Sequence, residues 1–170
     1  GGAFTGTALV DFTGANQSIT SGSSVFNNID ISGSAVKALQ DNLTVTNDLT
    51  ISSSLSLAST ALQINLGGNW LNNGGFTRNS ETINLTGAGA QSIGGTSLNS
   101  FTNLTVNKAS GGVSNNGQLD LNGTMTISSI TAFDLDGTGT GVFRLVSNTT
   151  DDARIAALAS GASLNGNMIF

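Results

Sequence analysis

The sequence contains no cysteine, histidine, proline or tyrosine, and these absences exclude several kinds of chemistry and structure. Without cysteine and histidine the chain has no thiolate nucleophile, no imidazole base and no ordinary zinc or haem site. Average proline usage of about 5% would supply roughly eight prolines in a chain of this length. Their absence indicates a backbone whose N–H groups are nearly all hydrogen-bonded.

Charged residues are also scarce, at 9% of the chain against about 25% in an average protein. The formal net charge is -5 at pH 7, and the few lysines and arginines do not form the cluster that a nucleic-acid-binding surface needs. Apolar residues, at 38%, lie in short pairs that are too dispersed for a membrane span and too frequent for a disordered coil. We therefore expect a folded protein that binds no nucleic acid and has no membrane span.

The chain does contain an internal repeat, built largely from glycine, serine, threonine, asparagine and aliphatic residues. VDFTGANQSI (10–19) matches INLTGAGAQSI (83–93), and LTVTNDLTISS (43–53) matches LDLNGTMTISS (119–129). The offset between the copies grows from 73 to 76 residues, and every added residue falls between matched blocks. An insertion inside a strand would turn all following side chains to the other face. The blocks are therefore predicted to be strands and the gaps to be turns.

This repeat predicts a domain organisation. Two copies, residues 1–73 and 74–140, form one array over residues 1–140, and residues 141–170 form a closing segment that begins a further, truncated module. Because the chain begins with glycine and ends on an apolar run at Phe170, we expect it to be a piece of a longer protein.

Apolar and polar residues alternate within the blocks, as in Leu43-Thr-Val45 and Leu49-Thr-Ile51. This period of two is typical of strands that bury one face, and the Gly-, Ser- and Asn-rich connections are typical of turns. Only residues 151–158 are equally compatible with a short helix and with a strand. The residues predicted to point into the core are Val10, Phe12, Phe26, Ile29, Ile31, Leu43, Val45, Leu49, Ile51, Ile83, Leu85, Phe101, Leu104, Val106, Leu119, Leu121, Met125 and Ile127.

Two all-β folds are compatible with this alternation: an antiparallel sandwich or barrel, and a parallel β-solenoid. The short strands, the long repeat and the absence of proline even from turns favour the solenoid. A coil of roughly 20 to 25 residues divides the repeat into about three coils. We predict an all-β parallel β-helix (β-solenoid) of about seven coils, and a right-handed one because the left-handed hexapeptide pattern is not kept.

The string GGxFT…VxFTG…QSI…FxNLxV…LxVxxxLTISS resembles the β-strand repeats of large secreted and cell-surface proteins of Bacteroidota, which are exported by type IX secretion and include adhesin-like proteins. The resemblance covers almost the whole chain, and residues 141–170 are similar to the segment that closes such an array. It implies an extracellular or cell-surface location and a structural role, with secretion machinery and surface glycans as candidate partners. It supplies no catalytic motif.

Acidic residues offer two candidate sites. Asp134 and Asp136 lie on one side of a strand before a Gly-rich turn, where they offer oxygen ligands to calcium, but no third acidic ligand accompanies them. Asp151 and Asp152, with Arg154, are candidates for glycoside chemistry, but adjacent residues of a strand point to opposite faces. We therefore expect no catalytic residue and no cofactor, with calcium at the first pair as the alternative to a plain turn.

Two Thr-x-Thr pairs, Thr44-x-Thr46 and Thr124-x-Thr126, resemble the threonine arrays of ice-binding solenoids. The positions of the second copy that match the first pair carry Asp120 and Asn122 instead. These residues interrupt the array, so the sequence does not predict ice binding.

We predict a noncatalytic, exported solenoid segment that acts as a stalk or adhesin-like repeat of a larger surface protein. Its partners would be neighbouring modules of the same chain, since stacked coils bury a core that no coil buries alone. The first alternative is a glycan- or surface-binding module, with Trp70 as the candidate contact, although core packing explains this tryptophan more simply. The second is a polysaccharide lyase or hydrolase, which needs acids clustered with lysine or arginine in a groove.

Overall fold

The computed structural model describes residues 6–129, 132–137, 139–147 and 152–170. Over these residues it contains 23 short strands and no helix. Sheet A comprises β1 (Leu9–Phe12), β4 (Asn28–Ile31), β7 (Leu49–Ile51), β10 (Trp70–Asn72), β13 (Gln91–Gly94), β16 (Val113–Asn115), β19 (Ala132–Asp134) and β22 (Ser163–Asn165). Sheet B comprises β2 (Gln17–Ile19), β5 (Val36–Leu39), β8 (Ser54–Leu57) and β11 (Gly75–Thr77). Sheet C comprises β3 (Val25–Phe26), β6 (Leu43–Val45), β9 (Gln63–Leu66), β12 (Thr82–Leu85), β15 (Asn103–Val106), β18 (Thr124–Ile127) and β21 (Arg154–Leu158). Sheet D comprises β14 (Asn99–Phe101), β17 (Gln118–Leu121), β20 (Val142–Leu145) and β23 (Met168–Ile169).

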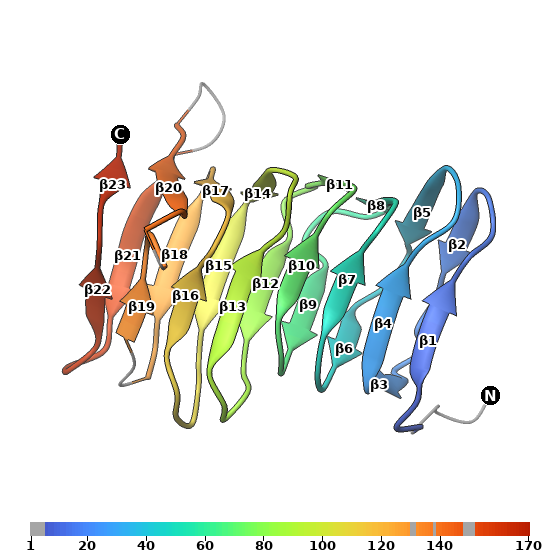
Figure 1. Ribbon diagram of the computed structural model, residues 1–170, viewed down its shortest axis with the longest axis horizontal. Coiled ribbons are helices and arrows are strands. Elements are labelled where there is room, and N and C mark those ends of the chain that lie inside the picture. The colour runs from blue at the N-terminus through green and yellow to red at the C-terminus, as the bar shows by residue number, and fades with distance from the viewer. Residues whose placement is uncertain (1–5, 130–131, 138, 148–151) are drawn as a thin grey trace.

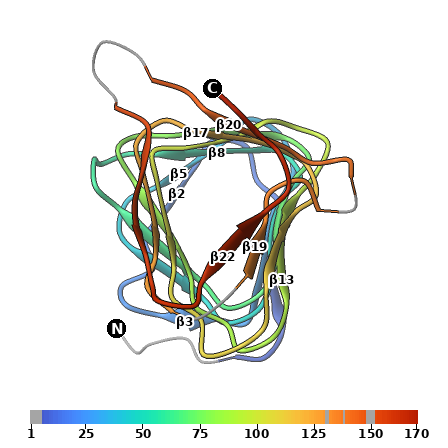
Figure 2. The ribbon, with the colours of Figure 1, turned by 90° about the vertical axis from the view of Figure 1, so that its left-hand side faces the viewer.

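The chain visits these sheets in turn, so each coil contributes one strand to sheet A, one to sheet B or D and one to sheet C. Every pair of neighbouring strands is parallel, for example β1 with β4 and β6 with β9. The protein is therefore a β-solenoid of about seven coils with a three-sided cross-section (Figures 1 and 2). In Figure 1 the strands of sheet A run upward in front, the chain passes over the top to the back, and each coil advances toward the C-terminal end, which makes the coil right-handed.

Coil length agrees with the sequence pattern, but the phase of the repeat does not. Partners along sheet A lie 19 to 23 residues apart from β1 to β19. The block at 10–19 forms β1 and β2, whereas its copy at 83–93 forms β12 and β13. The repeat therefore spans eleven strands, one strand less than four coils, and not the expected three coils. As a result, matched residues of the two copies lie on different faces of the solenoid.

The core prediction is confirmed. Every residue predicted to point inward is buried except Val10 and Phe12, which are half-buried in the first coil and pack against the core. The reason is local, because alternate residues of a strand point to the same side. The core is continuous from coil to coil, as a solenoid requires.

An aromatic cluster lies where the third side of the solenoid changes from sheet B to sheet D. Trp70 lies with its ring centroid 5.0 Å from that of Phe76 and 5.0 Å from that of Phe101, both at edge-to-face angles. Phe76 belongs to β11, the last strand of sheet B, and Phe101 to β14, the first strand of sheet D. Three large rings therefore fill the core at the place where the two sheets do not pair with each other.

Side-chain oxygens at the corners explain the abundance of asparagine. At the corner before sheet A, Oδ1 of Asn28 accepts the backbone N–H of Asp48 at 3.2 Å, and Oδ1 of Asp48 accepts that of Asn69 at 2.7 Å. Oδ1 of Asn69 then accepts the N–H of Ser92 at 2.9 Å. Each coil thus supplies an acceptor for a backbone donor of the next coil, where ladder hydrogen bonds end.

Two lysines are buried, which the alternation did not predict. Lys37 points inward from β5, and its ammonium donates to the backbone carbonyls of Ser32 and Ser34. The ammonium of Lys108 donates to the carbonyls of Gly87 and Gly89, at 2.8 Å each. Burial lowers the pKa of Lys108. Both lysines therefore hold corner turns from the inside through carbonyl acceptors.

The structure resolves the ambiguity near the C-terminus, since Arg154–Leu158 is a strand, β21. Within the described part of the chain, no helix has the length and apolar character needed to cross a membrane.

Candidate functional site

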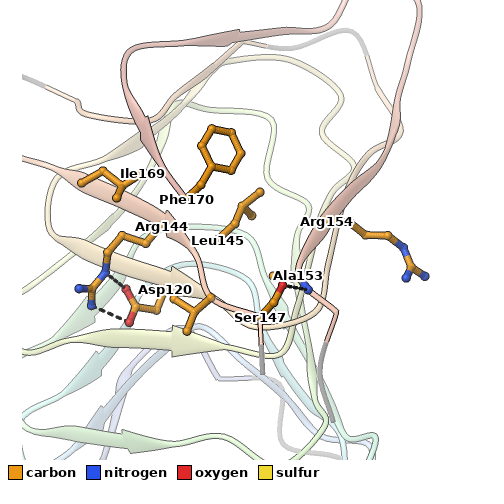
Figure 3. Close-up of a pocket in the computed structure, with 9 residues that line it drawn as sticks. Asp120, Arg144, Leu145, Ser147, Ala153, Arg154, Ile169 and Phe170 are labelled. Atoms are coloured by element: carbon orange, nitrogen blue, oxygen red, sulfur yellow. Dashed lines mark hydrogen bonds and ion pairs between the residues drawn. The ribbon is translucent and has the colours of Figure 1, made fainter. Parts of the chain in front are cut away.

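The largest concave site lies at the C-terminal end of the solenoid, between β20 and β23 of sheet D and the start of β21 of sheet C (Figure 3). Its volume is about 850 Å³. The cleft is lined by Asp120, Arg144, Leu145, Val146, Ser147, Ala153, Arg154, Ile169 and Phe170. Ile169 and Phe170 are 51% and 92% exposed, so part of the wall is apolar surface in contact with water.

One ion pair crosses the floor of this cleft. Asp120 of β17 and Arg144 of β20 are direct partners in neighbouring strands. The guanidinium donates from Nε to Oδ1 at 2.6 Å and from Nη2 to Oδ2 at 2.7 Å, which is a two-pronged contact. The hydrogen bond and the charge of Asp120 raise the pKa of Arg144. The carboxylate is thus occupied by an arginine that it holds in place.

The second arginine of the cleft does not join this pair. Arg154 extends away from Arg144 (Figure 3) and donates to Asp152 at 3.3 Å. The side chains of Arg154 and Asp152 are 59% and 82% exposed, so their attraction is largely screened by water. Among the described residues that line the cleft, Asp120 is the only acid. Glycoside hydrolysis needs two carboxyl groups that flank one bond, and this lining provides one, already bound to arginine.

The other acidic candidates lie elsewhere. Asp134 accepts the backbone N–H of Gly137 at 3.1 Å, and Asp136 accepts the side-chain amide of Asn167 at 3.2 Å. Neither lines the cleft with Arg144. Over the described residues, no three acidic side chains gather in a group that would hold a metal ion. Both carboxylates act as acceptors for neighbouring turns. Asp151, the partner proposed for Asp152, lies outside the described residues.

Trp70 is in the core and not on a binding surface. Its side chain is 0% exposed, and its indole Nε1 donates to Oδ1 of Asn99 at 2.8 Å. A sugar can stack only on an accessible ring, so Trp70 is not the exposed contact that a glycan-binding module needs. The sequence had left core packing as the simpler explanation, and the structure agrees with it.

The threonine pairs lie on one face after all. Thr44 belongs to β6 and Thr126 to β18, and both strands belong to sheet C. Asp120, which was expected to interrupt the array, lies in β17 of sheet D. The expectation was wrong because it placed matched residues of the two copies on the same face, whereas the repeat is out of phase with the coils.

Fold and geometry define the class of the protein, an all-β solenoid whose largest cleft contains one arginine–carboxylate pair. No protein-family model, curated protein or solved structure matches the chain.

Proposed function

We propose that this chain is a noncatalytic structural segment, a stalk or adhesin-like repeat, of a large exported surface protein. The observation that supports it best is the continuous core, in which each coil covers the apolar residues of the next. Seven coils at the strand spacing of about 4.8 Å form a rod roughly 34 Å long. Such a rod sets a distance between the parts of a protein that it joins.

The interior contacts support a load-carrying role. Backbone ladders connect every pair of successive coils along sheet A and sheet C, and the corner acceptors add bonds between the coils. Charged side chains are few and mostly occupied by partners within the fold, such as Asp120 with Arg144. The polar groups of this chain are therefore spent on holding coils together.

Neighbouring modules of the same longer chain are the partners that we propose. A further strand following β23 would reach sheet C beside β21, and it would cover the cleft with its exposed Ile169 and Phe170. An extracellular or cell-surface location and export by type IX secretion rest on the resemblance of the repeat blocks alone.

The test combines shape with activity. Small-angle X-ray scattering should report a rod with the axial length of the stacked coils, and incubation with neutral and acidic polysaccharides should release no new chain ends. An Asp120→Asn variant serves as the matched control, because it removes the only acid of the cleft lining. Polysaccharide cleavage by the natural chain that is lost in Asp120→Asn would overturn the structural proposal in favour of a lyase or hydrolase.

A further inference from the structure

The outward side of sheet C carries an ordered array of uncharged polar residues. It extends over β6, β9, β12, β15 and β18 and the residue that follows each of these strands. We call it the polar array, and it consists of Thr44, Thr46, Gln63, Asn65, Gly67, Thr82, Asn84, Thr86, Asn103, Thr105, Asn107, Thr124, Thr126 and Ser128. These residues are exposed or half-buried, while the residues between them are buried in the core.

Strand register makes the array two-dimensional. The central row runs Thr44, Asn65, Asn84, Thr105 and Thr126, each paired with the next along the sheet. Neighbouring members of a row lie about 4.8 Å apart, and successive outward positions of one strand about 6.6 Å apart. The pairing has no shift from β6 to β18, and the first irregularity falls between β18 and β21.

Side-chain hydrogen bonds hold parts of the array in place. The amide of Asn84 donates to Oδ1 of Asn65 at 2.8 Å, and the amide of Asn65 lies 3.4 Å from Oγ1 of Thr44. At the edge of the array, the hydroxyl of Thr86 donates to the carbonyl of Leu66 at 3.3 Å. A ladder of this kind reduces the rotamer freedom that binding would otherwise have to remove.

Charge separates this face from the other two. Sheet A presents Asp11 and Asp30 as outward neighbours, and sheet D presents Asp120 with Arg144. The polar array contains no charged residue and no aromatic residue. In the described part of sheet C, the first charged strand residue is Arg154, beyond the irregularity.

We propose that the polar array binds the surface of ice, a function beyond the proposed structural role. Hydroxyl and amide groups both donate and accept hydrogen bonds, so a regular, neutral array of them holds water at regular spacing. A charged side chain would instead orient water radially around itself, against the order of a lattice. The lack of aromatic rings argues against a crystalline polysaccharide as the occupant, since sugars stack on exposed rings.

Ice-affinity partitioning provides the test. The purified protein is mixed with a non-binding protein of similar net charge and exposed to a slowly growing ice shell, and protein is measured in the ice and in the remaining liquid. The natural chain should be enriched in the ice and should inhibit ice recrystallisation. Thr105→Lys, which places a charge in the central row, should reduce the ice fraction to that of the non-binding protein.

A matched control lies on sheet A. Thr50→Lys introduces the same change at an outward, half-buried threonine of β7, and it should leave enrichment unchanged. Thr105→Val, which keeps the side-chain shape, serves as a second array variant, and chemical denaturation verifies that every variant is folded. Exclusion of the natural chain from ice, equal effects of the two lysine variants, or binding to microcrystalline cellulose in place of ice would overturn the proposal.

Discussion

At the scale of single residues, what a side chain contributes depends on which side of its strand it occupies. Phe101 of β14 is 0% exposed and packs against Trp70, whereas Thr105 of β15 is half-buried on the outer side of sheet C. The two residues are only four positions apart, yet one fills the core and the other faces water. Their substitutions should therefore differ widely in effect.

Truncation of Phe101 should test this difference. Phe101→Ala removes a ring from the aromatic cluster and should lower the free energy of unfolding by about 3–5 kcal/mol. Thr105→Ala removes an outward hydroxyl and methyl group and should lower it by well under about 1 kcal/mol. Urea denaturation of both variants and the natural chain measures the two values. Equal losses would show that the assignment of inward and outward positions is wrong.

Acid should reveal the contribution of another residue, Asp41. Burial raises the pKa of its carboxyl, but the N–H groups of Ser21 and Gly22, each at 2.8 Å, outweigh this and lower it below the ordinary value of 3.8. A carboxyl whose pKa is lower in the folded state stabilises the fold above its unfolded pKa, and this stabilisation is lost as the pH falls through the folded pKa.

Asp41→Asn should therefore destabilise the protein by roughly 1 kcal/mol at neutral pH. The difference from the natural chain should disappear at about pH 2, where both side chains are neutral. Denaturation at the two pH values measures it. A difference that persists unchanged in acid would show that the carboxylate charge does not contribute.

At the scale of strands and corners, the fold tolerates changes in length at one place and not at the other. Corner lengths differ between coils, since partners along sheet A lie 19 to 23 residues apart. Strands do not vary in this way, because one extra residue turns every following side chain to the opposite face. Corner acceptors such as Asp48 are the elements that absorb the difference.

Insertion of a single glycine should separate the two cases. Between Ser59 and Thr60, in the exposed turn after β8, it should reduce the free energy of unfolding by about 1 kcal/mol or less. Between Leu104 and Thr105, inside β15, it should abolish cooperative unfolding, because apolar side chains would leave the core. Circular dichroism with urea titration gives the answer, and equal tolerance of both insertions would contradict the register of sheet C.

At the scale of the whole molecule, the two ends of the rod offer similar edges. β1 pairs on one side with β4, and β23 on one side with β20, in the described structure. Apolar side chains lie at both ends, with Leu9 58% and Phe170 92% exposed. Parallel edges with apolar neighbours are a route to head-to-tail association.

The isolated chain should therefore self-associate as its concentration rises. Sedimentation velocity should show a weight-average mass that increases with concentration, and Phe170→Asp should shift it toward the monomer. A monodisperse monomer at high concentration would indicate that the chain covers its own ends and forms a self-contained domain.

Local pattern determined much of this protein. The alternation in blocks such as 43–53 was sufficient to predict strands, the inward residues and the parallel solenoid, because the direction of a side chain depends only on its place in a strand. The buried side of Phe101 and the outer side of Thr105 both follow from that rule.

Only the tertiary structure decided which face each strand joins. Corner lengths and long-range pairing set the phase of the coils, so Thr44 lies on sheet C while its match, Asp120, lies on sheet D. Pairing also brought Asp120 to Arg144, 24 residues later in the chain. Lys37 points inward because carbonyls of a neighbouring turn replace its water, and an alternation of residues contains no record of such acceptors.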